Sequence, residues 1–410
     1  MKTLYLHIGM PKTGTTSIQT FCELNRELLK EMGYWYPESI HKYKNVSIRR
    51  NGHFLVGQCK DSEGKRNKKK ENTLFKKGLQ MIVDGFNTYD SIILSDENLW
   101  HGSIKHRKNL WTLLKEHSAN HNYKIKVIIY LRRQDDLILS WLNQKIKCGW
   151  SCGGVLTWES YLENPDTIVM DYAKYLDIIA GELGKESLCV RIFERGKFKG
   201  EDGTLISDFL DAVGLPFDAD YTMEEGFSNT ALTYNGQEIK RIVNTLPDSD
   251  DSTYLYVRDM ALQSVGTSVT EEHYDYLSLE ERKEFLSRYE EGNAHVAKEY
   301  LGIEDGKMFK EVTSSKEKWN AQNPYMQEDI IRFFGQIVLN QEKRIQALEK
   351  QQKQFLKELD ALKEQTTAKE LNITNELNTI KELITATQAK VDSSITQKLK
   401  KTFNKKQINQ

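Results

Sequence analysis

The 410-residue sequence lacks several features that would assign it to a class at once. It has no run of about 18 apolar residues, so no membrane-spanning helix is expected. Its 58 basic and 59 acidic residues nearly cancel, and this balance gives no reason to expect a nucleic-acid partner. The five cysteines are scattered and form no Cys-x-x-Cys pair, which favours a reduced compartment without disulfides. The N-terminus also lacks the uninterrupted apolar core of a signal peptide, so we expect a cytoplasmic protein.

Short β-branched runs alternate with longer amphipathic patterns up to about residue 320. This alternation predicts an α/β fold of three layers, with a central parallel sheet between helices. The strands are expected at residues 4–8, 91–94, 125–131 and 188–193. Apolar side chains at helical spacing predict a helix from about Gly14 to Gly33. The charged segment 60–72 has no apolar periodicity and is predicted to be a surface loop, with a contact to an acidic acceptor as the alternative.

The composition changes from about residue 326, where Lys, Glu and Gln dominate and proline disappears. We therefore expect three regions: a globular α/β domain over 1–322, a coiled-coil segment over 326–400 and a basic tail over 401–410. The coiled-coil seam is expected at Ile331, Phe334, Val338, Gln341, Ile345, Leu348, Gln352, Phe355, Leu359 and Leu362, and, after a step of eleven residues, at Ile373, Leu377, Ile380, Ile384, Thr387 and Val391.

A helix this long and polar cannot bury its apolar stripe alone, so the pattern favours self-association. Packing along the globular domain, or an unstable tail, is the alternative. Glutamines at seam positions weaken the pattern and do not select a dimer over a trimer. The lysine-rich end is predicted to be a solvated tail, with contact to an anionic surface as the alternative.

The segment from Gly9 to Ser17 lies between the first expected strand and the first expected helix. Backbone N–H groups and the helix dipole converge there on one anion, so the segment is predicted to bind phosphate. Its two glycines have the spacing of a nucleotide-triphosphatase loop, but Thr15 follows Gly14 and the lysine stands at Lys12. Such a loop suits one compact phosphate better than a Mg²⁺-bound triphosphate. Lys12 would then stabilise charge on a departing oxygen.

A second candidate corner lies where the strand over 125–131 ends. Arg132 follows the strand, and Ser140 stands eight residues later on the early turns of the next expected helix. Asp135 or Asp136 is expected to cap that helix. The guanidinium and the hydroxyl are then expected to face one phosphate, with Arg133 as the alternative cation.

These two segments resemble the donor-binding motifs of the sulfotransferase family. The run Pro11-Lys12-Thr13-Gly14-Thr15-Thr16 after a strand is similar to the loop that binds the 5′-phosphosulfate of 3′-phosphoadenosine 5′-phosphosulfate (PAPS). Arg132 and Ser140 match the arginine and serine that hold the donor's 3′-phosphate. The resemblance implies a P-loop-like fold, PAPS as donor without a metal, and donor binding by Pro11, Lys12, Thr13, Gly14, Thr15, Thr16, Ser17, Arg132 and Ser140.

The resemblance also covers weaker matches over about residues 1–310. The segment 94–99 looks like the strand end that supplies a carboxylate in glycan and bacterial sulfotransferases, with Glu97 at the matching position. The stretches 190–195, 229–234 and 288–301 are similar to recurrent bacterial segments. The Arg-Lys-Gly signature of the cytosolic animal enzymes is absent, so the glycan-type branch fits better. The implied acceptor is a hydroxyl or an amine of a glycan.

The implied reaction is an in-line displacement at sulfur, with Lys12 and Glu97 as the catalytic residues. Lys12 would stabilise the leaving oxygen, and Glu97 would take the acceptor proton as general base, with Asp96 as the alternative. A kinase that uses Mg-ATP and a non-enzymatic scaffold that presents the coiled coil remain competing hypotheses.

Further candidates carry weaker signals. His53 and His101 could approach the acceptor, although a lone histidine is usually structural. His117 and His121 have the spacing of metal ligands but no accompanying cluster, so no metal site is expected. Core packing is the default expectation for each tryptophan, and Trp100 and Trp150 are the first to test for stacking on a sugar ring.

Overall fold

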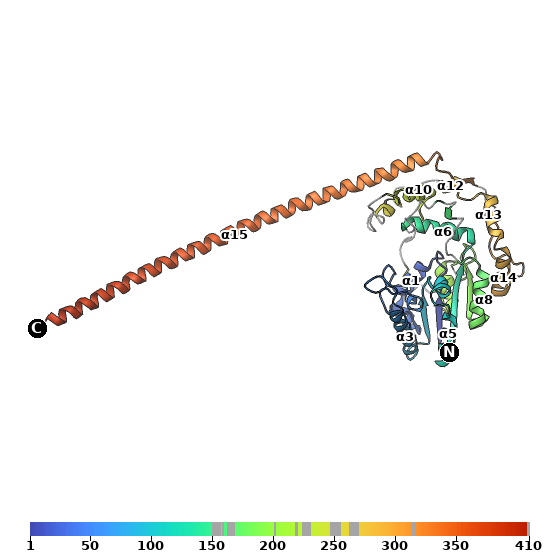
Figure 1. Ribbon diagram of the computed structural model, residues 1–410, viewed down its shortest axis with the longest axis horizontal. Helices are drawn as coiled ribbons and strands as arrows, with labels where there is room; N and C mark the ends of the chain where they lie inside the picture. Colours follow the sequence, from blue (N-terminus) through green and yellow to red (C-terminus); the bar gives the residue numbers. More distant parts are fainter. Residues whose placement is uncertain are drawn as a thin grey trace. The chain divides into compact units, whose positions relative to one another are not determined.

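The computed structural model describes residues 1–149, 157, 160–161, 169–200, 202–217, 220–223, 231–246, 256–261, 270–313 and 316–407. The chain divides into two compact units, Met1–Phe334 and Gly335–Gln410. The first unit holds a five-stranded parallel sheet, and the second belongs to one long helix (Figure 1). The α/β class, the central parallel sheet and the long C-terminal helix are therefore confirmed. None of the described helices is both long enough and apolar enough to span a membrane.

The sheet has the strand order β2-β3-β1-β4-β5, and every pairing is parallel. Its strands are β1 (Thr3–His7), β2 (Tyr34–Trp35), β3 (Ser91–Ser95), β4 (Lys124–Leu131) and β5 (Leu188–Ile192). The two-residue edge strand β2 was not predicted, because two residues carry no detectable alternation. A separate pair of short parallel strands consists of β6 (Tyr274–Asp275) and β7 (Glu317–Lys318).

The described part of the chain also contains helices. They are α1 (Thr15–Leu24), α2 (Arg26–Glu31), α3 (Lys68–Gly85), α4 (Leu99–Lys105), α5 (Leu110–Asn120), α6 (Gln134–Lys147), α8 (Tyr172–Leu183), α9 (Leu205–Val213), α10 (Tyr234–Val243), α12 (Thr270–His273), α13 (Leu279–Ser287), α14 (Glu290–Leu301) and α15 (Met326–Gln407), with 3₁₀ turns η1 (His53–Leu55) and η2 (Lys185–Ser187).

One buried cluster joins α1, α2 and α9 to the sheet. It contains Ile18 and Phe21 from α1, Phe209 from α9, and Ile128 and Tyr130 from β4. Helices α5, α8 and α14 pack beside one another, α5 against β4 and α14 against β5. The central strand β1 contributes Leu4 and Leu6 to one face of the sheet and His7 to the other, and all three are fully buried.

The helix predicted over 14–33 is two helices that meet at Asn25. The side chain of Asn25 donates to the carbonyls of Phe21 and Thr222 and accepts from the backbone N–H of Thr222. Apolar periodicity continues across the break, so the pattern alone did not show it. Asn25 competes for backbone hydrogen bonds and ends the first helix.

The loop predicted over 60–72 is also shorter than expected, because α3 begins at Lys68. The Asn67 side chain accepts a hydrogen bond from the backbone N–H of Lys70 and caps this helix. Glu71 is buried, where it pairs with Arg66 and accepts from the backbone N–H of Cys59. The charged segment 60–72 thus contributes a structural ion pair, between Arg66 and the buried Glu71.

The first turns of α15 belong to the globular unit. Phe333 is fully buried, and Asp329 accepts a hydrogen bond of 2.7 Å from the Asn235 side chain at the start of α10. In the second unit every residue from Gln341 to Lys401 is exposed, including the apolar side chains of the predicted seam. The helix continues through 401–407, where a tail was expected.

We predict that Gly14→Ala destabilises the protein by about 2–4 kcal/mol. Gly14 has a φ of 74°, and a β-carbon there would lie 2.2 Å from Leu205 Cδ2. Gly33→Ala is the matched control, since Gly33 has a φ of 81° but open space around it, and it should cost about 1–2 kcal/mol. Urea unfolding measures both variants. Equal losses would show that packing around Gly14 adds nothing.

Candidate functional site

The segment between β1 and α1 forms a tight loop. Gly9 and Gly14 have positive φ angles of 93° and 74°, and Lys12 adopts a left-handed φ of 69° that side chains rarely take. The Thr13 hydroxyl donates to the Met10 carbonyl over 2.6 Å and fixes the turn from inside. Helix α1 starts without a side-chain cap. Its first backbone N–H groups therefore remain available to an anion.

Arg132 links this loop to the end of β4. Its Nη1 donates a hydrogen bond of 2.9 Å to the Lys12 carbonyl, and its own carbonyl accepts from the Tyr172 hydroxyl over 2.6 Å. Ser140 lies two turns into α6. The two predicted corners are therefore adjacent in the fold, although 120 residues separate Lys12 from Arg132.

A cavity of about 280 Å³ lies where these segments meet. Lys12, Arg132 and Ser140 all line it, and α6 adds Asn143 and Lys147. The remaining wall is formed by Asp136, Leu139, Ala231, Leu232, Tyr234, Gln237, Tyr276 and Arg282. The buried Oε1 of Gln237 has no hydrogen-bond partner among the described residues. The cavity thus combines cations, hydroxyls and aromatic rings.

Positive charge dominates the Lys12 side of this cavity. Burial, together with the nearby charges of Lys147 and Arg132, lowers the pKa of Lys12 to about 8. Burial also lowers the pKa of Arg132. Lys12 Nζ donates to Gln144 Oε1 over 3.1 Å, and the Asp136 carboxylate on the cavity wall partly offsets the effect of burial on Arg132. Cations that repel one another in a buried place are stabilised by a bound anion.

The neighbouring Arg133 has a different role from Arg132. It makes a bidentate contact with Asp135, and Arg282 bridges Asp135 and Asp275. Arg133 was the alternative to Arg132 as the cation that faces a phosphate, and these contacts engage its guanidinium. The predicted capping of α6 by Asp135 or Asp136 is wrong, because both residues lie in the first turn of the helix and Arg133 holds the N-cap position. Asp135 instead pairs with Arg133 and Arg282.

Glu97 lies directly against the loop. A β-carbon at Gly9 would come within 3.1 Å of Glu97 Cβ, so the absence of a side chain at position 9 permits this approach. The Glu97 carboxylate is about one-fifth exposed and has two partners. Arg50 Nη1 lies 3.2 Å from its Oε1, and Gln19 Nε2 donates to its Oε2 over 3.1 Å.

Asp96, the alternative base, is fully buried and fully engaged. It contacts Arg50, lies 2.6 Å from His53 Nδ1 and accepts from the Asn98 backbone N–H over 2.7 Å. Burial works to raise its pKa, but Arg50 and His53 outweigh burial and hold the pKa below its usual value. Asp96 therefore supports its neighbours and has no oxygen free for an acceptor.

The weaker candidates are largely structural. Trp100 is fully buried and packs edge-on against Tyr175, so it belongs to the core, as expected by default, and is no platform for a sugar. His53 is buried on Asp96, and burial lowers the pKa of His101 to about 4. His117 bonds to the Tyr123 hydroxyl, and no group of three or more metal-ligating side chains occurs in the described residues. Trp150 and Asn229 lie outside the described residues.

Several residues of the site were not predicted. Gln19 and Arg50 touch Glu97, and Lys147 shares the cavity with Lys12. The signal for Gln19 was a polar residue on the apolar face of the first helix, one turn after Thr15. Arg50 carried no signal, because it stands in an irregular segment between β2 and η1.

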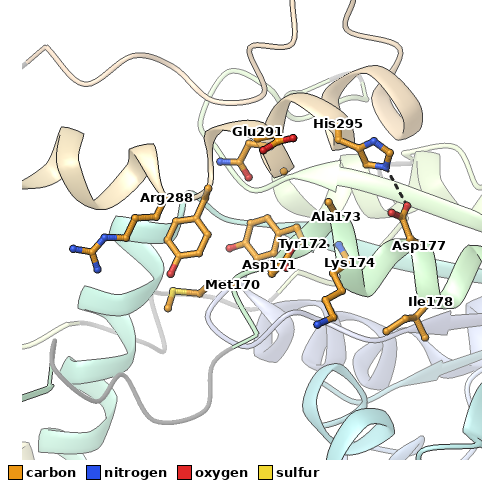
Figure 2. A pocket seen from close by; sticks show the side chains of 13 residues that line it. Met170, Asp171, Tyr172, Ala173, Lys174, Asp177, Ile178, Arg288, Glu291 and His295 are labelled. Atoms are coloured by element: carbon orange, nitrogen blue, oxygen red, sulfur yellow. Dashed lines mark hydrogen bonds and ion pairs between the residues drawn. The ribbon is translucent and has the colours of Figure 1, made fainter.

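A larger hollow of about 830 Å³ lies elsewhere, between the start of α8 and the junction of α13 with α14. Figure 2 shows Asp171, Lys174, Arg288 and Glu291 around it, and His295 bonded to Asp177. Charges of both signs are mixed over its wall. It contains none of the predicted site residues.

Comparisons with known proteins give limited information. No family model matches the chain. An uncharacterized protein from Archaeoglobus fulgidus is 26% identical over 183 residues, which cover 44% of this chain and 47% of that protein. The chain thus spans about half the length of this relative. A sulfotransferase structure from Alicyclobacillus acidocaldarius aligns with a TM-score of 0.33 and 14% identity, over 62% of this chain and 94% of that one. This similarity is too weak to carry an argument about the site.

We predict that His7→Gln weakens the pH dependence of stability. Burial lowers the pKa of His7 to about 3. Between pH 6.5 and 3 the unfolded chain binds a proton that the folded chain excludes, so the folded state loses stability as pH falls. Removing His7 should reduce this slope by up to about 1.4 kcal/mol per pH unit. Urea unfolding at pH 7, 6 and 5 measures the slope of the unfolding free energy against pH. The exposed His121→Gln is the control, and equal slopes in all three proteins would contradict the prediction.

Proposed function

We propose that this chain is a sulfotransferase that moves a sulfuryl group from PAPS to a hydroxyl or an amine of a glycan. The observation that carries the proposal is the cavity shared by Lys12, Arg132 and Ser140, where two partly buried cations lie on adjacent segments and make hydrogen bonds to neutral oxygens. A ligand with two separate phosphate groups suits such an arrangement, because one group can meet the loop and the other the end of β4.

In this proposal the donor's 5′-phosphosulfate lies on the loop from Pro11 to Ser17. The uncapped start of α1 supplies backbone N–H groups, and Lys12 supplies the charge. Arg132 and Ser140 hold the 3′-phosphate. Thr13 is fully buried and acts through the shape of the loop, whereas Ser17 is exposed at its end.

The reaction is an in-line displacement at sulfur. The acceptor oxygen or nitrogen forms a bond to sulfur while the bond from sulfur to the bridging phosphate oxygen breaks. Lys12 and the loop N–H groups stabilise the charge that develops on that oxygen. Glu97 takes the acceptor proton, a contribution on the order of a hundredfold to ten-thousandfold. Its contact with Gly9 sets the base next to the phosphosulfate loop.

The glycan acceptor rests on the resemblance of the segment 94–99 to glycan-type enzymes. A cytoplasmic location likewise stays a prediction from the sequence. Incubation with a ³⁵S-labelled donor and a panel of glycans tests the acceptor class. Transfer of label only to non-carbohydrate hydroxyls would remove the glycan from the proposal.

We predict that Lys12→Ala and Arg132→Ala each weaken binding of adenosine 3′,5′-bisphosphate by about tenfold or more, since each removes one charged hydrogen-bond donor from a phosphate. Calorimetry without Mg²⁺ measures this. The control is Lys115→Ala, on the outer side of α5. Tight binding of Mg-ATP with indifference to the bisphosphate would support a kinase instead, and binding of neither would support a scaffold.

We also propose that the chain self-associates through α15. Its exposed apolar side chains follow the predicted seam: Leu348 is 62% exposed and Leu377 is 52% exposed. In an isolated helix this stripe stays in water, whereas a second copy with the same period would cover it. The glutamines at 341 and 352 reduce the stability of such an interface.

We predict that the full chain is oligomeric at micromolar concentration and that Leu348→Lys shifts it towards the monomer. A charge at a seam position has no partner when the helices pair, so it opposes association. Ala347→Lys places the same charge outside the seam and should leave the mass unchanged. Sedimentation equilibrium measures all three proteins. A monomeric parent chain would refute the interface.

A further inference from the structure

A buried hydrogen-bond network lies beneath Glu97 and ends on its carboxylate. The Gln19 amide nitrogen donates to Glu97 Oε2 over 3.1 Å and to Ser95 Oγ over 3.2 Å. Ser95 Oγ in turn lies 2.8 Å from His7 Nδ1. Gln19, Ser95 and His7 are all at most 3% exposed, so water does not compete for these contacts.

The direction of the hydrogen bond between His7 and Ser95 depends on the tautomer of His7, and one tautomer gives the Ser95 hydroxyl an acceptor for its proton. Because burial lowers the pKa of His7 to about 3, its ring is neutral and Nδ1 can accept the Ser95 proton. Ser95 Oγ then accepts from Gln19, and both amide hydrogens of Gln19 are used, one for Ser95 and one for Glu97. A carboxylate only accepts hydrogen bonds when ionised, so the amide faces the form of Glu97 that a proton acceptor needs.

Arg50 holds the other oxygen of Glu97. Its guanidinium contacts Asp96 and lies 3.2 Å from Glu97 Oε1, so one cation bridges two consecutive carboxylates. The segment that carries Arg50 is fastened to β3, because Asn51 Oδ1 accepts from the Ser95 backbone N–H over 2.7 Å and Asn51 Nδ2 donates to the Ile93 carbonyl over 3.1 Å. Each oxygen of Glu97 therefore has a fixed donor from a different segment.

We propose that Gln19 and Arg50 are positioning residues for the proton acceptor, and that the buried row of His7 and Ser95 fixes the amide of Gln19. This inference rests on the proposed function. Gln19 and Arg50 keep the Glu97 carboxylate in one rotamer beside the phosphosulfate loop, so that a free lone pair faces the acceptor. They do not touch the donor, and they act on the transfer step through Glu97.

A double-mutant cycle tests this role with the acceptor that the ³⁵S panel yields. Gln19→Met keeps the length of the side chain and removes its two donors. We expect kcat to fall by about tenfold in Gln19→Met and by about a hundredfold or more in Glu97→Gln. If Gln19 acts through Glu97, adding Gln19→Met to Glu97→Gln changes kcat by less than about twofold. The affinity for adenosine 3′,5′-bisphosphate should stay at the parent value throughout.

Two further variants complete the test. Gln80→Met makes the same change at an exposed helical glutamine and should leave kcat unchanged. Arg50→Lys keeps the charge but cannot span both carboxylates, so it should lower kcat in the parent and much less in Glu97→Gln. Should Gln19→Met fail to fold, Ser95→Ala takes its place in the same cycle, with a smaller effect of the same kind.

The outcomes distinguish a failure of the positioning role from a failure of the proposed sulfotransferase function. If transfer occurs and the effects of Gln19→Met and Glu97→Gln multiply independently, the positioning role is wrong and the sulfotransferase proposal stands. If the parent chain neither binds the bisphosphate nor transfers label, the proposed function fails and the positioning role fails with it.

Discussion

The parallel pairing of β1 with β3 on one side and β4 on the other is the constraint on which the site depends. Parallel strands end at one edge of a sheet, so the segments that follow them meet there. The loop with Lys12 follows β1, Glu97 follows β3, and Arg132 follows β4. None of these residues is close to another in sequence. Hydrogen bonding along three backbones, and not any direct attraction between the side chains, brings them together.

The charged side chains at this edge of the sheet form two groups, and the two groups differ in the partners that compensate their charge. Around Glu97 and Asp96, one guanidinium serves two carboxylates, and the remaining oxygens are met by an amide, an imidazole and a backbone N–H. Around Lys12 and Arg132 the hydrogen bonds of the cations go to neutral oxygens, those of Gln144 and of the Lys12 backbone. The first group is satisfied within the protein. The second group is where we propose that an anion binds, because like charges held close together are stabilised by an opposite charge.

Much of this arrangement could be predicted from the sequence, for identifiable reasons. The four longer strands were found because buried parallel strands are continuous apolar runs, and the loop at Gly9–Ser17 was found because two glycines spaced between a strand and a helix are typical of an anion-binding turn. Edge strand β2 was missed because it has two residues. Gln19 and Arg50 were missed because their importance comes from contacts with a residue 78 and 47 positions away in the chain, respectively, and no local pattern carries such a contact. Trp100 lies in the core, which is the default expectation for a large aromatic residue after a strand.

The shared amide of Gln19 limits which amino-acid replacements this chain can accept during evolution. Its two hydrogens serve Ser95 and Glu97 at once, so a replacement at any one of the three positions leaves a donor or an acceptor unmatched in a dry environment. Single steps away from this trio are costly, whereas a joint exchange of all three is not. Across diverging descendants of this gene, positions 19, 95 and 97 should therefore change together or not at all.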